Sequence, residues 1–432
     1  MTFLNHFTSN AVVRRLLHGV GANFAGKIWA LIIQIVSVPV MSMTWGVDGF
    51  GVWLMISTIP TYLALSDFGL GVAAGVNLTA AMEQEDRETG LRVFQSVWCF
   101  LTIVTVSVGG LCIAGAAFWL SLSPLDTSGP FERVEIFKAI CCIVAASLLT
   151  MQMSILKVVF QATHKYALGT AVFDLIYFIG SIFVLVTVLL GGSLWVAALV
   201  QFLTRIFGFY IFNALQKSYE PWCALGWRYA NIETLKRLMS PSLSALSLTV
   251  ANSFGLQGVV LTIGWVFGPA TAATFATTRM LTRVPMQFSG LLTRASLPEL
   301  TRSQVSKNST LTTKLMKLNM GLTLSVMLPA ALVLVVLGPL LISFVSHGEM
   351  EQTRTAFALL GLATTFCAIW TTLGTRLIAI NRQSEFAFSA LALYLACAVM
   401  PYVFFPNITP ILITLALADG LIMLVTINRA KK

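Results

Sequence analysis

Long apolar stretches separated by short polar segments run along the whole chain of 432 residues. A helix needs about 20 apolar residues to cross the hydrocarbon core of a bilayer, and by this criterion the pattern predicts twelve membrane-spanning helices. The spans are expected at 20–45, 50–75, 93–120, 137–161, 167–190, 194–215, 241–266, 270–292, 319–346, 354–379, 386–405 and 408–428. The eighth and twelfth spans fit the criterion least well, because each contains buried charge. The pattern therefore predicts an all-α polytopic membrane protein.

The composition agrees with lipid as the main solvent of this chain. Hydrophobic residues make up 57% of the sequence and charged residues only 10%, whereas a soluble domain carries about 25% charged residues. The formal net charge is +10, which taken alone would also suit a nucleic-acid-binding protein. In a membrane chain, an excess of Lys and Arg is the ordinary result of retaining cytoplasmic loops on the inner side. The composition therefore favours a membrane protein over a nucleic-acid-binding one.

The distribution of basic residues predicts the orientation of the spans. With both termini on the inner side, inner segments hold about 20 of the 27 Lys and Arg residues, and outer loops hold about three. The outer three are Arg133, Lys138 and Arg354. Both termini are therefore expected to be cytoplasmic.

The two halves of the chain show signs of duplication. Arg14-Arg15-Leu16-Leu17 precedes Lys236-Arg237-Leu238-Met239 by 222 residues, and Gly46 precedes Gly268 by the same offset. We predict an N-terminal six-helix bundle at 1–216, a cytoplasmic amphipathic linker helix at 217–239 and a C-terminal six-helix bundle at 240–432. Because six is even, the two bundles would share one topology and be related by an axis along the membrane normal.

The sequence contains no pattern that indicates catalysis or a bound cofactor. The seven cysteines form no C-x-x-C pair, the four histidines are scattered, and neither a Walker sequence nor a nucleophile elbow occurs. Asp67-Phe68-Gly69 imitates the magnesium triad of kinases, but no Gly-rich loop or catalytic loop accompanies it. The chain is therefore expected not to be an enzyme and to need no metal or organic cofactor.

Charged residues inside the spans are the candidates for function, because each costs several kcal/mol unless it is paired or hydrated. They are Lys27, Asp67, Asp174, Arg205, Arg279, Arg283 and Asp419. Arg279 and Arg283 stand four residues apart, which places both guanidinium groups on one face of the eighth span near mid-bilayer. Guanidinium groups bind phosphate oxygens in a bidentate manner, so this pair predicts an anion site. Thr271, Thr274, Thr278 and Thr282 add hydroxyl groups to the same helix.

The acidic residues admit two interpretations each. Asp174 and Arg205 are expected at similar depth in neighbouring spans, where they form either a structural ion pair or part of a substrate site. Asp419 either neutralises one arginine of its own half or acts as a coupling site. One carboxylate cannot neutralise both arginines.

A polar stripe marks the first span. Asn23, Lys27 and Gln34 lie within ~40° of one another on a helical wheel. Such a stripe in an apolar helix should face the interior of a bundle or a water-filled cavity. Lys27 is therefore a candidate cavity-lining cation.

Two stretches resemble a known family. They are Gly49-Phe50-Gly51-Val52-Trp53, and Leu65-Ser66-Asp67-Phe68-Gly69-Leu70-Gly71 followed by Asn77. They are similar to the polysaccharide-transport branch of the MOP flippase superfamily, which includes O-antigen and exopolysaccharide flippases. Elsewhere the resemblance depends on the twelve spans, the duplication and Pro298-Glu299-Leu300 at the end of the eighth span.

The resemblance implies a MATE-like fold and a flippase of the bacterial inner membrane. Its members carry undecaprenyl-pyrophosphate-linked oligosaccharides across the bilayer, with two bundles that rock around a cationic central cavity. Other membrane proteins of glycan assembly would be partners. Lys27, Arg279 and Arg283 would line that cavity, although none of them matches a strict family motif.

Energy for transport would come from an ion gradient, because the sequence contains no nucleotide-binding motif. The coupling ion would be H⁺ or Na⁺, and Asp67, Asp174 and Asp419 are the candidate carriers. Asp67 matches the family aspartate, and a purely structural role is the alternative for it.

Two other functional classes remain open at this point. A MATE-like multidrug antiporter would need a cavity dominated by carboxylates and aromatic rings, whereas embedded basic groups slightly outnumber acidic ones here. A membrane glycan polymerase or ligase would need a sizeable outer loop, and the longest outer loop expected here runs only from Ser121 to Glu135.

Overall fold

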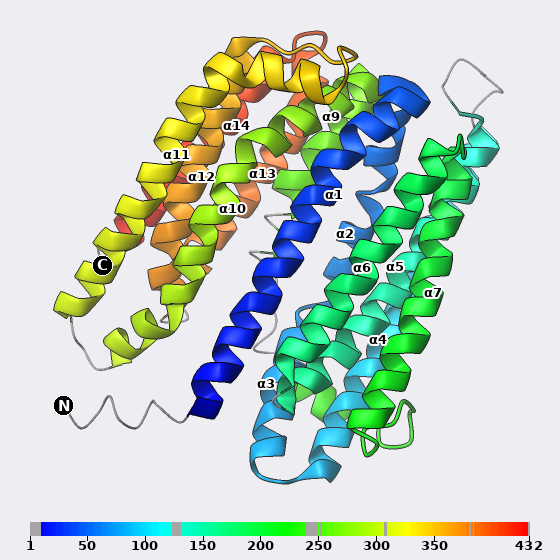
Figure 1. Cartoon of the computed structure of the whole chain (residues 1–432), viewed down its shortest axis with the longest axis vertical. Helices are drawn as coiled ribbons and strands as arrows, with labels where there is room; N and C mark the ends of the chain where they lie inside the picture. The colour runs from blue at the N-terminus through cyan, green and yellow to red at the C-terminus, as the bar shows by residue number, and fades with distance from the viewer. Residues whose placement is uncertain are drawn as a thin grey trace. The chain divides into compact units, whose positions relative to one another are not determined.

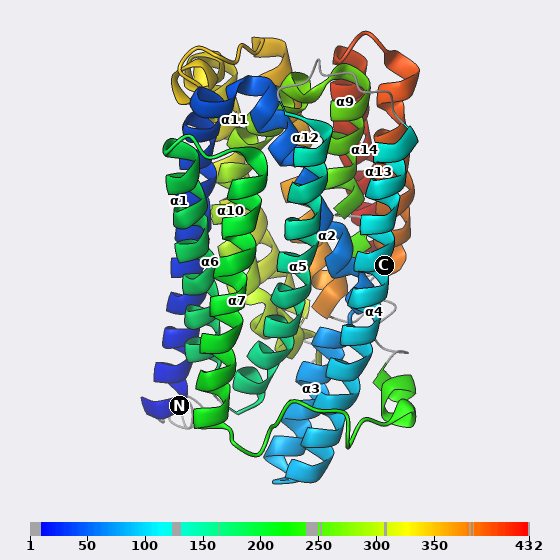
Figure 2. The same cartoon turned by 90° about the vertical axis from the view of Figure 1, so that its right-hand side faces the viewer.

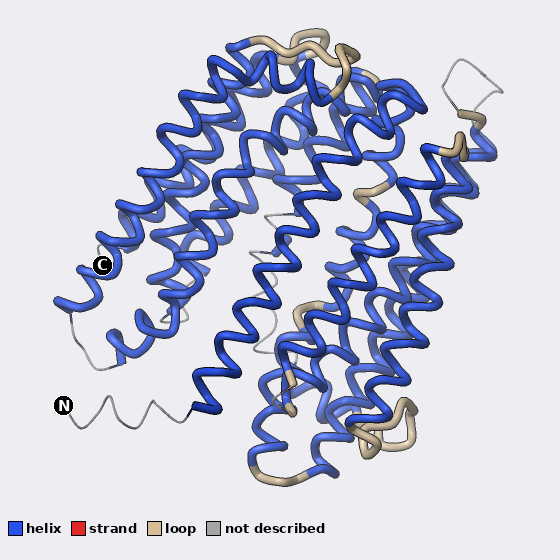
Figure 3. The backbone as a smooth tube through the Cα atoms, viewed as in Figure 1, coloured by secondary structure: helices blue, strands red, loops and turns tan. Residues whose placement is uncertain are grey.

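The computed structural model describes residues 10–122, 131–163, 165–238, 249–250, 253–305, 309–379, 382 and 384–430. These residues are almost entirely helical and contain no strand (Figure 3). The first seven helices are α1 (Asn10–Ile56), α2 (Ile59–Ala64), the short 3₁₀ helix η1 (Leu65–Asp67), α3 (Leu70–Glu83), α4 (Arg87–Leu122), α5 (Arg133–Ala162) and α6 (Tyr166–Leu189). They are followed by α7 (Leu194–Tyr219), the π-helical turn η2 (Phe254–Gly258), α9 (Val259–Phe267), α10 (Pro269–Val305), α11 (Ser309–Val345), α12 (Arg354–Ala379), α13 (Ser384–Phe404) and α14 (Thr409–Ala430).

Within the described residues, nine helical stretches are long and apolar enough to cross a membrane. They coincide with most of the predicted spans, and the expected all-α polytopic fold is confirmed. Much of the span predicted at 241–266 lies outside the described residues, and α10 is less apolar than the others because it carries charge. The total of twelve spans stays a prediction.

The prediction of one uninterrupted helix over 50–75 is wrong. Helix α1 continues to Ile56, and α2, η1 and α3 follow as separate pieces. The break before α3 falls at Phe68 (φ 50°) and Gly69 (φ 74°), both in the left-handed region that ends a helix.

The contacts divide the chain into two compact units. The first contains residues 1–40 and 59–243, and the second contains 41–58 and 244–432. Helix α1 therefore contributes to both, and its backbone leaves helical geometry at Gly46 (φ 72°, ψ 172°). The domain limits expected from the sequence remain a prediction, and we refer below to the N-terminal and C-terminal units.

In the N-terminal unit, α4, α5, α6 and α7 run alongside one another (Figure 1). Its core contains fully buried aromatic and aliphatic side chains of α3, α4, α5 and α7. Phe160 of α5 lies at its centre and packs edge-on against Phe212 of α7, with ring centroids 5.4 Å apart. Close packing here depends on Gly169, where a Cβ atom would lie 2.6 Å from the Phe160 side chain.

The segment after α7 differs from the expected amphipathic helix. Residues 220–231 form turns and bends, and only 232–238 are helical. Cys223 and Leu238 are buried in the core of the N-terminal unit. The segment is therefore part of that unit rather than a free connection.

In the C-terminal unit, side chains of α9, α10, α12, α13 and α14 form two apolar clusters. One joins α9 and α10 to α12, α13 and α14. The other lies around Trp370 of α12, Phe386 of α13 and Ile422 of α14. The second cluster adjoins the polar site described next.

Candidate functional site

A buried cluster of polar side chains lies inside the C-terminal unit. It is contributed by four helices and contains Arg279, Arg283, Cys367, Trp370, Tyr394 and Asp419. Three of these were predicted from sequence. The other three, Trp370, Tyr394 and Cys367, were not predicted. Each is a residue with one polar atom inside an apolar span, and the sequence does not distinguish such a residue from an ordinary core residue.

Asp419 of α14 is the acceptor at the centre of this cluster. Its side chain is 4% exposed. The Tyr394 hydroxyl donates to its Oδ1 at 2.6 Å, and the Trp370 indole N–H donates to the same oxygen at 3.1 Å. Two donors from α13 and α12 therefore fix the orientation of this carboxylate.

Arg279 of α10 is also buried, with 8% exposure. Its Nη1 donates to the backbone carbonyl of Leu256 at 3.3 Å, and its guanidinium lies 5.7 Å from the Phe275 ring centroid. Leu256 belongs to the π-helical turn η2, where the wider hydrogen-bond spacing disturbs the regular ladder and leaves carbonyls available. The π turn therefore supplies a partner for a buried guanidinium.

Gly255 of the same π turn lies against the ring of Tyr394. A Cβ atom at this position would be 2.7 Å from the ring, closer than packed atoms normally approach. The absence of a side chain thus allows the Tyr394 ring to reach Asp419 beneath η2.

Arg283, one turn further along α10, is half-buried and contacts the Cys367 side chain. Both arginines interact electrostatically with Asp419, but neither forms an ion pair with it among the described residues. The cluster therefore combines two cations with one carboxylate that already accepts two other hydrogen bonds.

The threonines of α10 do not extend this site as expected. Thr271, Thr274 and Thr278 each donate to the carbonyl four residues earlier. Thr282 donates to the Arg279 carbonyl and lies 3.5 Å from the Thr364 hydroxyl. These hydroxyl groups satisfy their own helix, as threonine commonly does in apolar helices.

The predicted ion pair between Asp174 and Arg205 is wrong. Arg205 is 3% exposed, stacks on the Tyr177 ring at 3.6 Å and donates to the Ile176 carbonyl at 3.4 Å. Helix α7 extends to Tyr219, so Arg205 lies ~21 Å from its inner end, whereas Asp174 lies ~12 Å from the start of α6. The two residues were expected at one depth because α7 was predicted to be shorter.

Asp174 instead faces α1 and α5. Its carboxylate lies against Gly26, where a Cβ atom would overlap it, and it interacts electrostatically with Lys157 and Lys27. Lys27 itself is exposed. The N-terminal unit therefore holds a second group of two cations and one carboxylate. Lys157 was missed, although a lone lysine in the apolar run of α5 was a visible signal.

Asp67 has a local structural role. Its Oδ1 accepts a hydrogen bond of 2.7 Å from the backbone N–H of Gly69, and it also bonds the backbone of Gly71. Gly69 precedes α3, so the carboxylate satisfies otherwise free N–H groups at the start of that helix.

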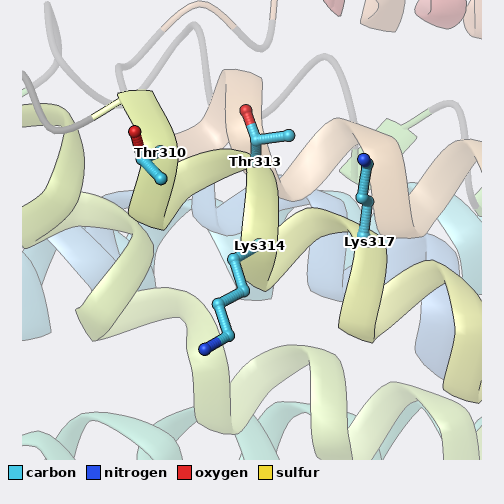
Figure 4. Close-up of a pocket in the computed structure, with 4 residues that line it drawn as sticks. All are labelled: Thr310, Thr313, Lys314 and Lys317. Atoms are coloured by element: carbon cyan, nitrogen blue, oxygen red, sulfur yellow. The ribbon is translucent and has the colours of Figure 1, made fainter.

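A cavity of about 520 Å³ lies elsewhere in the C-terminal unit, over the first turns of α11. Thr310, Thr313, Lys314 and Lys317 line it, with the two lysines pointing in different directions (Figure 4). None of the predicted site residues lines this cavity. Within the described residues, no group of three or more His, Cys, Asp or Glu side chains could hold a metal ion.

Neither a protein-family model nor a curated relative matches the sequence. Solved structures do resemble the fold. An inward-facing multidrug resistance MATE family transporter of the MOP superfamily matches with a TM-score of 0.70 and 15% identity over 94% of both chains. An outward-facing structure of such a transporter matches with a TM-score of 0.63 and 12% identity over 98% of this chain and 94% of that one.

A third match is a MOP superfamily transporter from Pyrococcus furiosus, described as having a binding pocket of reverse polarity that suggests a different function. Its TM-score is 0.60, with 14% identity over 94% of both chains. All three matched proteins are transporters. The chain has the fold of the MATE transporters of the MOP superfamily.

Proposed function

We propose that this protein is a flippase that carries a pyrophosphate-linked lipid oligosaccharide across the bacterial inner membrane by alternating access. The lipid carrier would be undecaprenyl pyrophosphate, as in the family that the first two spans resemble. Other membrane proteins of glycan assembly would supply the substrate and take it up.

The excess of positive charge in the C-terminal cluster carries this proposal. Arg279 and Arg283 share one carboxylate, Asp419, which already accepts hydrogen bonds from Tyr394 and Trp370. Buried like charges repel, so an incoming anion is stabilised at this position. A pyrophosphate group suits it because guanidinium groups bind phosphate oxygens through paired hydrogen bonds.

The N-terminal unit, considered by itself, contains its own cationic group. Lys27 and Lys157 interact with Asp174, again two cations for one carboxylate. A headgroup with two phosphates requires more than one cation. Its release requires that the binding of the phosphates by these cations weakens during transport. Asp174 and Asp419 provide competing intramolecular partners for these cations.

Coupling to H⁺ or Na⁺ is assigned to Asp419 in this mechanism, with Asp174 as the corresponding residue of the N-terminal unit. When Asp419 is neutralised by the ion, its electrostatic attraction for the arginines is lost and they favour the substrate anion. Asp67 is left out of the coupling step because its carboxylate satisfies the start of α3.

The test is glycan display in a deletion strain complemented with Arg279→Gln/Arg283→Gln. Glutamine keeps hydrogen-bonding capacity but removes charge, and loss of a desolvated charge pair costs ~2–5 kcal/mol of binding. We expect loss of surface glycan at normal membrane expression. Lys314→Gln/Lys317→Gln is the matched control, because it removes two basic groups away from the cluster. Wild-type glycan from the arginine variant would refute the proposal.

A multidrug antiporter is the second candidate, and one observation favours it. Asp419 lies among the aromatic side chains Trp370 and Tyr394, which is a combination suited to organic cations. Under this alternative, deletion would sensitise cells to cationic drugs and leave surface glycan intact. The reverse-polarity pocket of the Pyrococcus furiosus protein illustrates why the fold alone does not decide the substrate.

A further inference from the structure

The segment between α7 and the C-terminal unit is held against α4 by hydrogen bonds to its backbone. Gln95 of α4 donates to the Ala224 carbonyl at 2.9 Å and accepts from the Tyr229 N–H at 2.9 Å. The Ser96 hydroxyl accepts from the Asn231 N–H at 2.8 Å. Gln95 and Ser96 are both 4% exposed, so these part-buried bonds form a seam whose α4 side is shielded from solvent.

A second seam fixes the start of the segment. Gln216 donates to the carbonyls of Glu220 and Cys223 at 3.2 and 2.6 Å. Lys165 pairs with the Glu220 carboxylate at 2.7 Å, and the Trp222 indole donates to the same carboxylate at 2.9 Å. Figure 2 shows the segment as a green loop that crosses the end of the unit where α3 lies. The segment therefore has a defined shape on the N-terminal unit.

Its outward side combines large apolar and basic side chains. Trp227 is 78% exposed and Ile232 69%, and Tyr229 is exposed as well. The exposed basic residues between 217 and 238 are Lys217, Arg228, Lys236 and Arg237, against one acidic residue outside the Lys165–Glu220 pair, Glu233. Exposing the Trp227 and Ile232 side chains to water is unfavourable, and the excess positive charge beside them has no neutralising partner among the described residues of this surface.

We propose that residues 224–237 form an anionic-lipid-binding surface, on which Trp227 and Ile232 enter the interfacial region and Arg228, Lys236 and Arg237 contact phospholipid headgroups. Tryptophan and tyrosine favour the level of the headgroups. Basic residues near an anionic leaflet each contribute about 1 kcal/mol, which is roughly a fivefold change in binding. The hydrogen bonds of Gln95 and Ser96 then hold α4 in place relative to the lipid-bound segment.

The position of the segment supports a lipid occupant rather than a soluble partner. It packs on α4 at the beginning of its apolar run, which starts at Val93 and follows the charged first turn of Arg87 and Glu88. The exposed tryptophan thus lies at the level where the membrane-spanning part of α4 begins. Positive charge at that level meets lipid phosphate.

The experiment measures backbone hydrogen exchange of residues 225–237 in the full-length protein, reconstituted into nanodiscs of phosphatidylcholine alone or with phosphatidylglycerol. We expect slower exchange with phosphatidylglycerol, and we expect added salt to reduce the difference. Lys236→Gln/Arg237→Gln should lower the protection roughly 25-fold, since two contributions are lost. Exchange within α5 reports that each variant is folded.

The control pair is Lys314→Gln/Lys317→Gln, which removes the same charge from α11. It should leave the protection of 225–237 unchanged. Equal exchange in both lipid compositions overturns the proposal, as does equal loss of protection in the control pair. Protection seen only in native membranes and in neither nanodisc would show that a protein partner covers the surface, and it also overturns the proposal.

Discussion

The Asp48 carboxylate accepts a hydrogen bond of 3.1 Å from the backbone N–H of Ala270, which lies 222 residues further along the chain. The same offset separates Gly46 from Gly268, and both glycines have an unusual extended backbone with positive φ (72° and 93°). It also separates the first residues of α4 and α11, Arg87 and Ser309. Asp48 thus contacts its own counterpart in the proposed repeat.

This contact predicts that Asp48 stabilises the start of α10. A carboxylate that accepts from a first-turn N–H acts as a helix cap, and replacing such a cap by alanine costs about 1 kcal/mol. We expect Asp48→Ala to lower the melting temperature of the purified protein, measured in detergent, while Asp48→Asn retains most of it because the acceptor oxygen survives. Equal stability of Asp48→Ala and wild type would show that the bond contributes nothing.

Gly51 should tolerate no side chain. A Cβ atom there would overlap the backbone carbonyl of Pro269, which cannot move like the end of a flexible side chain. We therefore expect Gly51→Ala to reduce folded yield, judged by size-exclusion chromatography of solubilised membranes. Gly110 is the matched control, because a Cβ atom added to it meets nothing within 4 Å. Normal yield from Gly51→Ala would contradict the close approach of α1 and α10.

Arg205 should stabilise the fold through its own contacts and not through an ion pair with Asp174. Arg205 is buried and stacked on Tyr177, and buried cation–π contacts contribute up to about 2 kcal/mol. We expect Tyr177→Leu to destabilise the protein in thermal unfolding, and Tyr177→Phe to retain most of the stability. A charge swap between residues 174 and 205 should rescue nothing. Rescue by that swap would contradict this prediction, because it would show that the two residues form an ion pair.

Asp419 should lose its fixed orientation when its donors are removed. Tyr394→Phe deletes the 2.6 Å hydrogen bond and leaves the ring in place, and a net hydrogen bond to a charged group contributes ~1.5–3 kcal/mol. We expect impaired glycan display with normal membrane expression. Tyr402→Phe is the control, because its side chain is exposed on the same helix. Equal activity of both variants would remove Tyr394 from the mechanism.

The Lys165–Glu220 pair predicts sensitivity to acid. Burial would raise the pKa of Glu220, but hydrogen bonds from Lys165, Trp222 and Thr163 outweigh it and hold the pKa below its usual range. The stability that this group contributes is therefore present above the ordinary glutamate pKa of about 4.3 and is lost as pH falls through the lower folded value. The melting temperature, measured at a series of pH values from neutral to acid, should fall because this stability is lost. In Glu220→Gln the melting temperature should depend less on pH.

The sequence predicted features that depend on local pattern and missed those that depend on where helices end. Hydrophobic length placed most of the spans, and the four-residue spacing put Arg279 and Arg283 on one face, as observed. Tyr394 and Trp370 could not be assigned to Asp419, because they come from two other helices and nothing along the chain encodes that packing. The Asp174–Arg205 prediction failed because a few residues of extra length in α7 changed the depth of Arg205 by more than one helical turn.

The π turn at Phe254–Gly258 has a consequence for every substitution planned in the seventh span. A π turn accommodates one residue more than an α turn, and each residue of an α-helix advances the side chain by about 100°. A helical wheel drawn continuously through this span therefore assigns the residues on one side of the turn to the wrong face. Deleting a single residue between 254 and 258 would restore the regular α-helical hydrogen bonds at this turn, and the Leu256 carbonyl would then be used by the helix instead of by Arg279.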